Sequence, residues 1–401
     1  MPATEPPRSP APPVLVVIGA SVRAWAWSAR RAGWHVRGAD LFADRDLLTI
    51  ADAIAVPPQD YPEGLATAAD RFPPGPWCYS GALENAPDLV DALAARRPLA
   101  GCPGSVLRQV RSPRLLGRAL AAAGLAFPAT RDAHHGLPED GTWLVKPRRG
   151  AAGRGIAPWH GPRAGAATES PRVWQERVPG VPVSASFILD ARGARLVGTT
   201  EQLVGLAAWH AAPFGWCGAV EIEPARLADR WLEQWTRVGR VLHEDFGLVG
   251  AVGVDAVAAG TGRLVVLEVN PRPTASMELV DRRTGGSLAL EHLVACGLAG
   301  GRPPAAAPAG GTQAKGVLRA RRPITVDARA TATLDDLARR FHDGDDRPGL
   351  ADLPRTGTTI PAGSPLLSLF AAGDGPEDAR RRLARRVALV EAALAGAPPG
   401  G

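Results

Sequence analysis

The chain has 401 residues, 45% of them hydrophobic, and a formal net charge of +6 at pH 7. This length suggests two or three domains, and no stretch approaches the roughly 20 apolar residues that a membrane span needs. The N-terminus lacks the charged-then-apolar pattern of a secretory signal, so we expect a cytoplasmic protein without a membrane partner. The four cysteines have no CxxC spacing, which indicates neither a zinc site nor a disulfide framework.

The positive charge is carried almost entirely by arginine, because Lys146 and Lys315 are the two lysines of the sequence. Apart from the runs at residues 380–382 and 385–386, the basic residues are dispersed, so we expect no nucleic-acid partner. A lysine kept against so strong an arginine bias indicates a specific role at each of these two positions.

The N-terminal part opens with a predicted strand at residues 14–18, a helix at 22–32 and a strand at 34–40. This is the first unit of a doubly wound sheet. The glycine fingerprint of a dinucleotide site is incomplete, although Asp40 ends a strand where a ribose-binding acid would lie. The alternatives are a purely structural domain or one face of a substrate cleft.

Residues 108–123 are predicted to form one helix, and Arg111 and Arg114 lie three residues apart on it. Side chains at this spacing share one helix face, so the two arginines could bind a phosphate together. The alternative is that both are solvated.

A glycine-rich loop follows the strand that Lys146 ends. It runs from Arg148 to residue 155 and contains Gly150, Gly153 and Gly155. Glycines let backbone N–H groups turn toward an anion, while the lysine and the arginines supply positive charge. The loop is not a Walker motif, because Gly-Lys-Ser/Thr is missing and a strand follows. The alternative is a flexible hairpin turn without a ligand.

Three further stretches are predicted to face ligands. A planar base could lie against the strand at residues 173–178 and take hydrogen bonds from the backbone of Glu176 and Val178. Any sheet edge would show the same pattern. Residues 198–203 and 209–218 are rich in glycine or aromatic residues and look like substrate-facing loops.

Carboxylates are expected to converge on a hairpin formed by strands at residues 252–257 and 264–269. Glu268 and Asn270 lie two residues apart, so both side chains project from one face. With a four-residue turn at 259–262, Asp255 becomes their diagonal neighbour at roughly 7 Å. Two carboxylates and an amide oxygen suit Mg²⁺ held jointly with substrate phosphates. The alternative is that the acids pair with arginines on a solvated face.

The remaining pattern predicts helices at residues 227–246, 288–296 and 376–394, and strands beginning at 314 and within 354–370. We therefore divide the chain into a tail (1–13), an α/β domain (14–107), a central domain (108–300), a linker (301–312), a β-rich C-terminal segment (313–395) and a second tail (396–401).

Taken together, the order of these motifs resembles the ATP-grasp superfamily. The specific part is Val-Lys-Pro-Arg-Arg-Gly-Ala-Ala-Gly-Arg-Gly, which ends at residue 155, together with Glu-Val-Asn-Pro-Arg, which ends at residue 272. The resemblance implies an α/β (α+β) ATP-grasp fold with a Rossmann-like pre-ATP-grasp domain and a small C-terminal β-rich segment.

The resemblance also implies roles for individual residues. Lys146 would hold ATP phosphates under the loop of Arg148, Gly150, Gly153 and Gly155. The segment of Gln175, Glu176 and Val178 would bind adenine. Asp255, Glu268 and Asn270 would bind two Mg²⁺ (or Mn²⁺), and Arg272 would act in catalysis with Lys146. The early phosphate-binding lysine of many relatives is not evident, so Arg111 or Arg114 would have to replace it.

The implied reaction joins a small-molecule carboxylate to an amine through an acyl phosphate, with release of ADP and phosphate. Residues 270–278, 198–205 and 314–320 look like ligases typified by tyramine-glutamate ligase of methanofuran synthesis, and residues 356–365 are similar to the tail of biotin-carboxylase-like chains. Biotin carboxylase itself is disfavoured, because Ala275 and Ser276 fill the region of its catalytic acid.

Two other functions stay open at this point. They are a bicarbonate-using carboxylase or carbamoyl-phosphate type of reaction, and a non-catalytic sensor that binds ATP. The sequence does not name the substrates, and a homodimer would be an ordinary state.

Overall fold

The computed structural model describes residues 12–162, 171–224, 227–260, 262–301, 310–342 and 347–395. Residues 1–11 of the predicted first tail, residues 302–309 of the predicted linker and the tail at 396–401 lie outside the described residues.

The first part of the chain forms a four-stranded parallel sheet in the order β3-β2-β1-β4. The strands are β1 (Val14–Ile18), β2 (His35–Asp40), β3 (Ala51–Ala55) and β4 (Trp77–Tyr79), and the helices are α1 (Arg23–Arg31), α2 (Arg45–Ile50), α3 (Glu63–Asp70) and α4 (Pro87–Ala94). The order of strands reverses between β1 and β4, and open α/β sheets bind ligands at the carboxyl ends of such a pair. The predicted doubly wound domain is confirmed.

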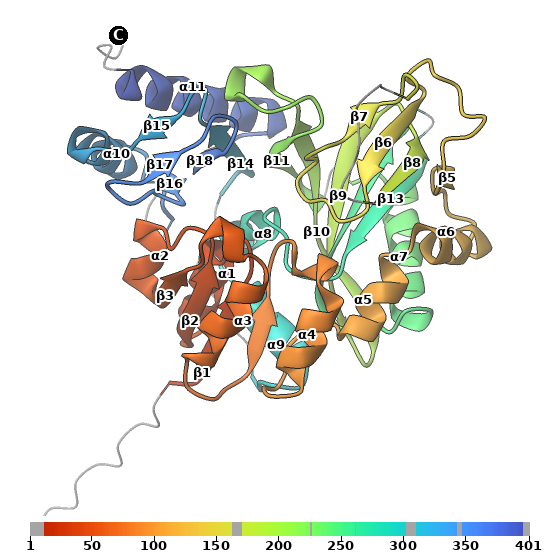
Figure 1. Cartoon of the computed structure of the whole chain (residues 1–401), viewed down its shortest axis with the longest axis horizontal. Coiled ribbons are helices and arrows are strands. Elements are labelled where there is room, and N and C mark those ends of the chain that lie inside the picture. Colours follow the sequence, from red (N-terminus) through yellow and green to blue (C-terminus); the bar gives the residue numbers. More distant parts are fainter. Residues whose placement is uncertain are drawn as a thin grey trace, which may run out of the picture.

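A large antiparallel sheet occupies the middle of the molecule (Figure 1) in the order β13-β12-β9-β10-β11-β14-β18-β16. Its strands are β9 (Val181–Asp190), β10 (Gly193–Val204), β11 (Trp216–Ile222), β12 (Gly250–Ala258), β13 (Leu264–Asn270), β14 (Thr312–Arg319), β16 (Leu350–Ala351) and β18 (Pro365–Gly373). Helix α7 (Asp229–Glu244) packs on β9 and β10 through the buried side chains of Trp235 and Val238. The predicted loop at 198–203 is wrong, because these residues lie inside β10 and pair with both β9 and β11.

A smaller sheet, which we call the lid sheet, has the order β5-β8-β6-β7. It consists of β5 (Thr130–Arg131), β6 (Trp143–Pro147), β7 (Ala157–Pro158) and β8 (Arg172–Glu176). In Figure 1 it lies beside the end of the large sheet where β13 runs. Two helices lead into it, α5 (Gly104–Val110) and α6 (Pro113–Ala122). The predicted boundary between residues 107 and 108 falls inside α5.

The C-terminal part continues the large sheet instead of forming a separate layer. β14 pairs with β11 and then with β18, and α11 (Pro376–Leu394) packs against both β14 and β18. The remaining elements are η1 (Pro58–Asp60), η2 (Leu83–Asn85), η3 (Ala207–Trp209), α8 (Met277–Thr284), α9 (Leu288–Ala295), β15 (Ile324–Thr325), α10 (Ala328–Arg340) and β17 (Thr359–Ile360). The predicted α/β (α+β) class, with a parallel N-terminal sheet and a β-rich C-terminal segment, is confirmed.

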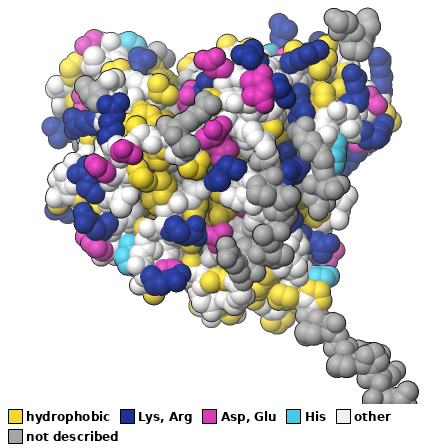
Figure 2. All heavy atoms as spheres, turned by 180° about the vertical axis from the view of Figure 1, so that it is seen from behind, with side chains coloured by type: hydrophobic (Ala, Val, Ile, Leu, Met, Phe, Trp, Pro, Cys, Tyr) yellow, Lys and Arg dark blue, Asp and Glu magenta, His cyan; other side chains and the backbone are white. Residues whose placement is uncertain are grey.

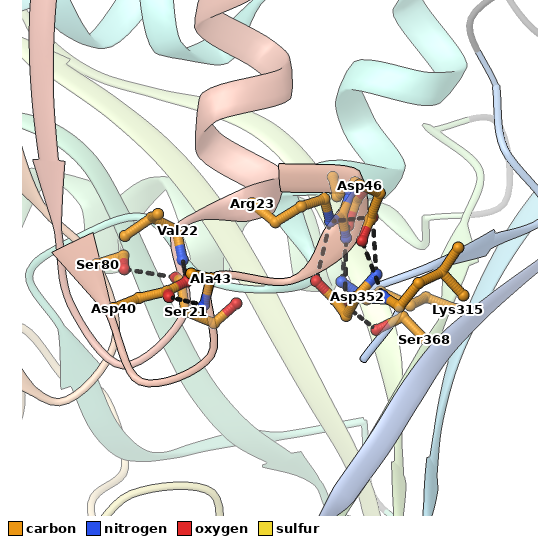
Figure 3. Close-up of polar contacts among 12 residues, drawn as sticks. Ser21, Val22, Arg23, Asp40, Ala43, Asp46, Ser80, Lys315, Asp352 and Ser368 are labelled. Carbon is orange, nitrogen blue, oxygen red and sulfur yellow. Dashed lines mark hydrogen bonds and ion pairs between the residues drawn. The ribbon is translucent and has the colours of Figure 1, made fainter. Parts of the chain in front are cut away.

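A buried ionic network joins the N-terminal domain to the large sheet (Figure 3). Arg23 at the start of α1 binds Glu278 of α8, with one bond of 2.9 Å from Nη2. Its Nε donates to Asp352 at 2.9 Å. Lys315 on β14 donates to the same Glu278 at 2.7 Å. Ser368 donates to Asp352. One of the two lysines of the chain is therefore held by a buried ion pair.

A buried histidine of α9 contacts both domains. His292 accepts a hydrogen bond at Nδ1 from the N–H of Ala251 in β12 (2.8 Å), and its Nε2 lies 3.1 Å from the carbonyl oxygen of Ala100. These contacts fix the neutral ring with its proton on Nε2. Burial lowers the pKa of His292 from its ordinary value of 6.5 to about 4.

We expect the contribution of His292 to the free energy of unfolding to depend on pH. Between pH 6.5 and 4 the unfolded chain binds a proton at His292 that the folded chain does not, so the contribution is complete near pH 7 and falls with pH through this window. We expect the difference in unfolding free energy between the wild type and His292→Gln to shrink by about 2 kcal/mol from pH 7 to pH 5. Urea unfolding at both pH values measures it, and a difference that does not change with pH would contradict the prediction.

The surface seen from behind in Figure 2 carries Lys and Arg side chains scattered among acidic and neutral ones. The arginines of the run at residues 380–382 are also balanced by acidic side chains. Arg380 pairs with Glu201, and both Arg381 and Arg382 pair with Asp378. Among the described residues, no helix combines the length and the apolar character that crossing a membrane requires.

Candidate active site

The acidic pair lies on adjacent strands of the large sheet. Asp255 of β12 pairs directly with Glu268 of β13, and the register shifts between Asp255 and Ala256, which faces Val266. The predicted diagonal arrangement is therefore wrong for two reasons. Ala258 pairs with Leu264, one residue further along than the predicted four-residue turn implies, and the extra residue Leu267 then forms a bulge, so that Glu268 lies opposite Asp255. The two carboxylates still share one face of the hairpin.

Charge repulsion and burial act on this pair. Burial and the neighbouring Glu268 carboxylate raise the pKa of Asp255 to about 6, although the hydrogen bond from Asn270 Nδ2 at 2.9 Å partly opposes them. Burial also raises the pKa of Glu268, but the charges of Arg111 and Lys146 outweigh it and hold this pKa below its ordinary value. The Glu268 side chain is 44% exposed, so its carboxylate faces the open cleft.

The two basic groups near Glu268 come from different elements. Arg111 directly follows α5, and its Nη1 lies 3.2 Å from Glu268 Oε2 and donates to the carbonyl oxygen of Val269 at 3.3 Å. Lys146 extends from β6 and donates to Gln175 Oε1 on β8 at 2.7 Å. Burial lowers the pKa of Lys146, and Glu268 opposes this.

The predicted helix at 108–123 is wrong, since it breaks into α5 and α6. Ser112 caps α6 by accepting a hydrogen bond from the N–H of Leu115, and proline follows at the first helical position. Arg111 is therefore the residue that follows α5, whereas Arg114 lies on α6. Arg111 enters the cleft, whereas Arg114 is exposed on the first turn of α6.

The glycine-rich loop between β6 and β7 covers a cavity of about 60 Å³. The cavity is lined by Arg111, Lys146, Pro147, Gly150, Ala151, Ala152, Gly153, Arg154, Ile156 and Glu268. The loop contacts the large sheet, because the N–H of Trp216 donates to the carbonyl oxygen of Ala152 at 3.1 Å. Arg148 instead points to Asp132 with its side chain partly exposed.

Gly153 is the position of this loop where an added side chain would clash most severely. Its φ of +74° is left-handed, and a Cβ atom there would lie 1.8 Å from the carbonyl oxygen of Phe214. We expect Gly153→Ala to weaken binding of Mg-ADP about 10-fold or more, because the loop can no longer rest on the large sheet. Gly136→Ala is the matched control, since Gly136 has φ +73° with nothing within 4 Å of the added atom. Calorimetry on both variants measures the effect, and equal affinities would contradict it.

The predicted adenine segment lies at the end of β8. Gln175 is buried and holds Lys146, while Glu176 pairs with Trp143 of β6. The Glu176 N–H already donates to the carbonyl oxygen of Ala129 at 2.8 Å. Within the described part of the chain the Val178 N–H has no hydrogen-bond partner, which leaves it open to a base.

Arg272 makes a contact that the sequence did not suggest. Its Nε and Nη2 each donate to a carboxylate oxygen of Glu84 at 2.7 Å, and Nη2 also lies 3.2 Å from Asn270 Oδ1. Glu84 lies in η2, shortly after β4. The sequence carried a signal for Glu84 alone and none for its pairing with Arg272, since an acidic residue follows a strand at the switch point of the parallel sheet.

The donor set of the hairpin fits a divalent cation shared with phosphates. Among the residues that the structure describes, no group of three or more His, Cys, Asp or Glu side chains is placed to hold a metal ion. Asp255 and Glu268 supply two carboxylates and Asn270 an amide oxygen, so phosphate oxygens would complete the coordination of Mg²⁺ or Mn²⁺. A cation would also relieve the repulsion that raises the pKa of Asp255.

Comparison with known proteins identifies the class of protein to which this fold belongs. Residues 113–276 match the family model of the ATP-grasp domain. The chain therefore contains an ATP-grasp domain, and the ATP-grasp resemblance predicted from the sequence is confirmed. A search of curated proteins finds none that matches this chain.

Solved structures of the same fold extend over almost the whole chain. N5-carboxyaminoimidazole ribonucleotide synthetase from Thermus thermophilus is 16% identical with a TM-score of 0.64, over 96% of this chain and 100% of that one. The biotin carboxylase domain of Hydrogenobacter thermophilus 2-oxoglutarate carboxylase, in complex with MgADP and bicarbonate, is 14% identical with a TM-score of 0.67, over 93% and 89%. Biotin carboxylase from Campylobacter jejuni is 14% identical with a TM-score of 0.66, over 95% and 96%. At these identities the likeness concerns the fold.

Proposed function

We propose that this protein is an ATP- and Mg²⁺-dependent ligase that joins a small-molecule carboxylate to an amine. The observation that carries the proposal is the convergence of Asp255 and Glu268 with Lys146, Arg111 and Arg272 on one cleft. These groups come from three strands of two sheets, from the end of α5 and from the segment that follows β13. A purely structural domain has no need to bring five charged side chains to the mouth of a glycine-rich loop.

The residues have distinct parts in the proposed reaction. Lys146 and the loop around Gly153 bind the phosphates, and the end of β8 binds the base. Asp255, Glu268 and Asn270 would hold the metal ion, which shields the phosphate charge when bound. Arg111 takes the place of the early phosphate-binding lysine, because it lies beside Glu268 and Arg114 does not.

The chemistry has two steps. A carboxylate oxygen of the substrate attacks the γ-phosphorus of ATP, so that an acyl phosphate forms and ADP leaves. The amine then attacks the acyl carbon, and inorganic phosphate leaves as the C–N bond forms. Arg272 lies beside Asn270 and neutralises the negative charge that develops on the transferred group. Catalysis of this kind depends mainly on position and charge.

The finer parts of the proposal concern substrates and assembly. The stretch at residues 270–278 resembles ligases of methanofuran synthesis, which supports an amino-acid or amine substrate in the synthesis of a one-carbon cofactor. The domain limits, a homodimer and a cytoplasmic location stay predictions from the sequence.

A bicarbonate-using reaction is the second candidate. It is favoured by the fold shared with the biotin carboxylase domain whose structure contains bicarbonate. Against it, Ser276 is buried and bonds Thr274 at 3.1 Å, in the region where the family resemblance places the catalytic acid of biotin carboxylase.

Release of ADP tests the proposal. The purified chain is incubated with ATP and Mg²⁺ and a pool of amino acids and amines, with and without bicarbonate. Release that needs the pool supports the ligase, and splitting the pool then identifies the substrate pair. Release that needs bicarbonate supports the second candidate. Tight ATP binding without stimulated release under either condition would overturn both and favour a non-catalytic sensor.

A further inference from the structure

Two neighbouring residues of the N-terminal domain reach into the nucleotide site. Glu84 binds Arg272 through two hydrogen bonds of 2.7 Å. Asn85 donates from Nδ2 to the carbonyl oxygen of Gly150 at 3.3 Å and accepts from Arg111 Nη2 at 3.4 Å. Three groups of the site, from three different segments, therefore contact the short turn that carries Glu84 and Asn85.

The Glu84 contact fixes the orientation of Arg272. The two side chains are 2% and 12% exposed, so water does not compete for the pair. Burial raises the pKa of Glu84, but the Arg272 charge outweighs it and holds this pKa below its ordinary value. Arg272 Nη1 also donates to the carbonyl oxygen of Pro273 at 3.0 Å. A planar guanidinium held at three of its nitrogens has one orientation left.

The turn that carries both residues is itself held in place. Ala82 has a left-handed φ of +74°, which an L-residue adopts only where its surroundings impose it. Leu83 is fully buried in the core, and Pro87 starts α4 directly after the turn. The turn therefore presents Glu84 and Asn85 to the cleft from a rigid support, as functional side chains require.

We propose that Glu84 is the positioning residue of Arg272 and that Asn85 is a second positioning residue, which ties the glycine-rich loop and Arg111 of the nucleotide site to the N-terminal domain. The role of Glu84 rests on the proposed ligase function, because it concerns the acyl phosphate that Arg272 faces. The role of Asn85 requires only that the cleft binds a nucleotide. The turn then couples closure over the nucleotide to the placement of the arginine.

Two variants of the full chain separate these roles. Asn85→Ala is expected to weaken Mg-ADP binding about 10-fold in calorimetry, because two hydrogen bonds to the loop and Arg111 are lost. Glu84→Gln is expected to leave this affinity within about 3-fold and to lower kcat about 100-fold through misplacement of Arg272. Glu84→Asp should recover part of kcat. Matched controls are Gln109→Ala on α5 and Glu63→Gln on α3, since both side chains are exposed.

The ratio of ligation product to ADP gives a second readout for Glu84. A misplaced Arg272 leaves the acyl phosphate open to water, so Glu84→Gln should release more ADP per product, and partial unfolding does not change this ratio. If the wild type turns over no substrate, hydrogen exchange of residues 270–276 decides instead, and it should rise in Glu84→Gln and not in Glu63→Gln.

The outcomes distinguish the inference from the proposed function. Absence of turnover in the wild type counts against the ligase but leaves the Asn85 and exchange measurements valid. The same loss of nucleotide affinity in both variants would show a merely structural turn. An unchanged affinity of Asn85→Ala for Mg-ADP would overturn the inference for Asn85. An unchanged ratio of product to ADP, together with unchanged hydrogen exchange of residues 270–276, would overturn it for Glu84.

Discussion

Replacing Glu268 by Gln is expected to lower substrate-stimulated ADP release by about 1,000-fold or more, while the protein stays folded. The carboxylate is one of two that would hold the metal ion, and it lies 3.2 Å from Arg111 and near Lys146. The variant loses the negative charge but keeps the size of the side chain. The metal ion and the triphosphate would then lose their fixed place relative to Arg272.

The measurement is kcat for ADP release with the substrate pair found in the pool. Glu244→Gln serves as the matched control, because Glu244 ends α7 on the exposed surface. The melting temperature of Glu268→Gln should lie near that of the wild type, since the side chain is 44% exposed. Activity that survives this change would place the metal ion, and the reaction, elsewhere.

The largest loss of stability is expected from Glu278→Gln. Glu278 is the shared anion of Arg23 and Lys315, and the side chains of the three are 1%, 3% and 4% exposed. Burial raises the pKa of Glu278, but the two cations outweigh it and hold this pKa below its ordinary value. Breaking such a buried group leaves uncompensated charge and costs about 3–5 kcal/mol.

Urea unfolding at pH 7, where Glu278 is ionised in both states, measures this loss. Asp70→Asn is the matched control, because Asp70 and Arg96 form a 2.7 Å ion pair with 45% and 49% of their side chains exposed. Such a surface pair contributes less than about 1 kcal/mol. Equal losses in the two variants would contradict the role of the buried network.

Most elements of the site followed from the sequence, because local patterns determine them. The strand that Lys146 ends, the loop after it and the hairpin of Asp255 and Glu268 all have short-range signatures. The bulge at Leu267 has no such short-range signature, since it depends on how β13 pairs with β12. Residues 198–203 were misread because strands facing a polar cleft can carry Thr, Glu and Gln where a core strand carries apolar residues.

Contacts between distant segments could not be predicted from the sequence. Nothing in the sequence pairs Arg23 with Glu278, 255 positions away, or Glu84 with Arg272, 188 positions away. These pairs exist because the N-terminal sheet packs on the large sheet. The periodicity of one segment does not indicate which distant segment it contacts. Lys315 illustrates this limit of sequence-based prediction. The rarity of lysine in the chain predicted a specific role for Lys315, but only the folded structure identifies its ion-pair partner.

The continuity of the large sheet determines where the chain can be divided. β14 and β18 come after residue 311, far along the chain from the acidic hairpin, yet they hydrogen-bond into the sheet that carries it. A recombinant fragment restricted to residues 113–276 would expose the edge of β11 and the apolar surface that α11 covers, and open edges of this kind drive aggregation. Deletion of the C-terminal part should therefore cost solubility as well as stability, and a useful truncation must retain the chain through residue 395.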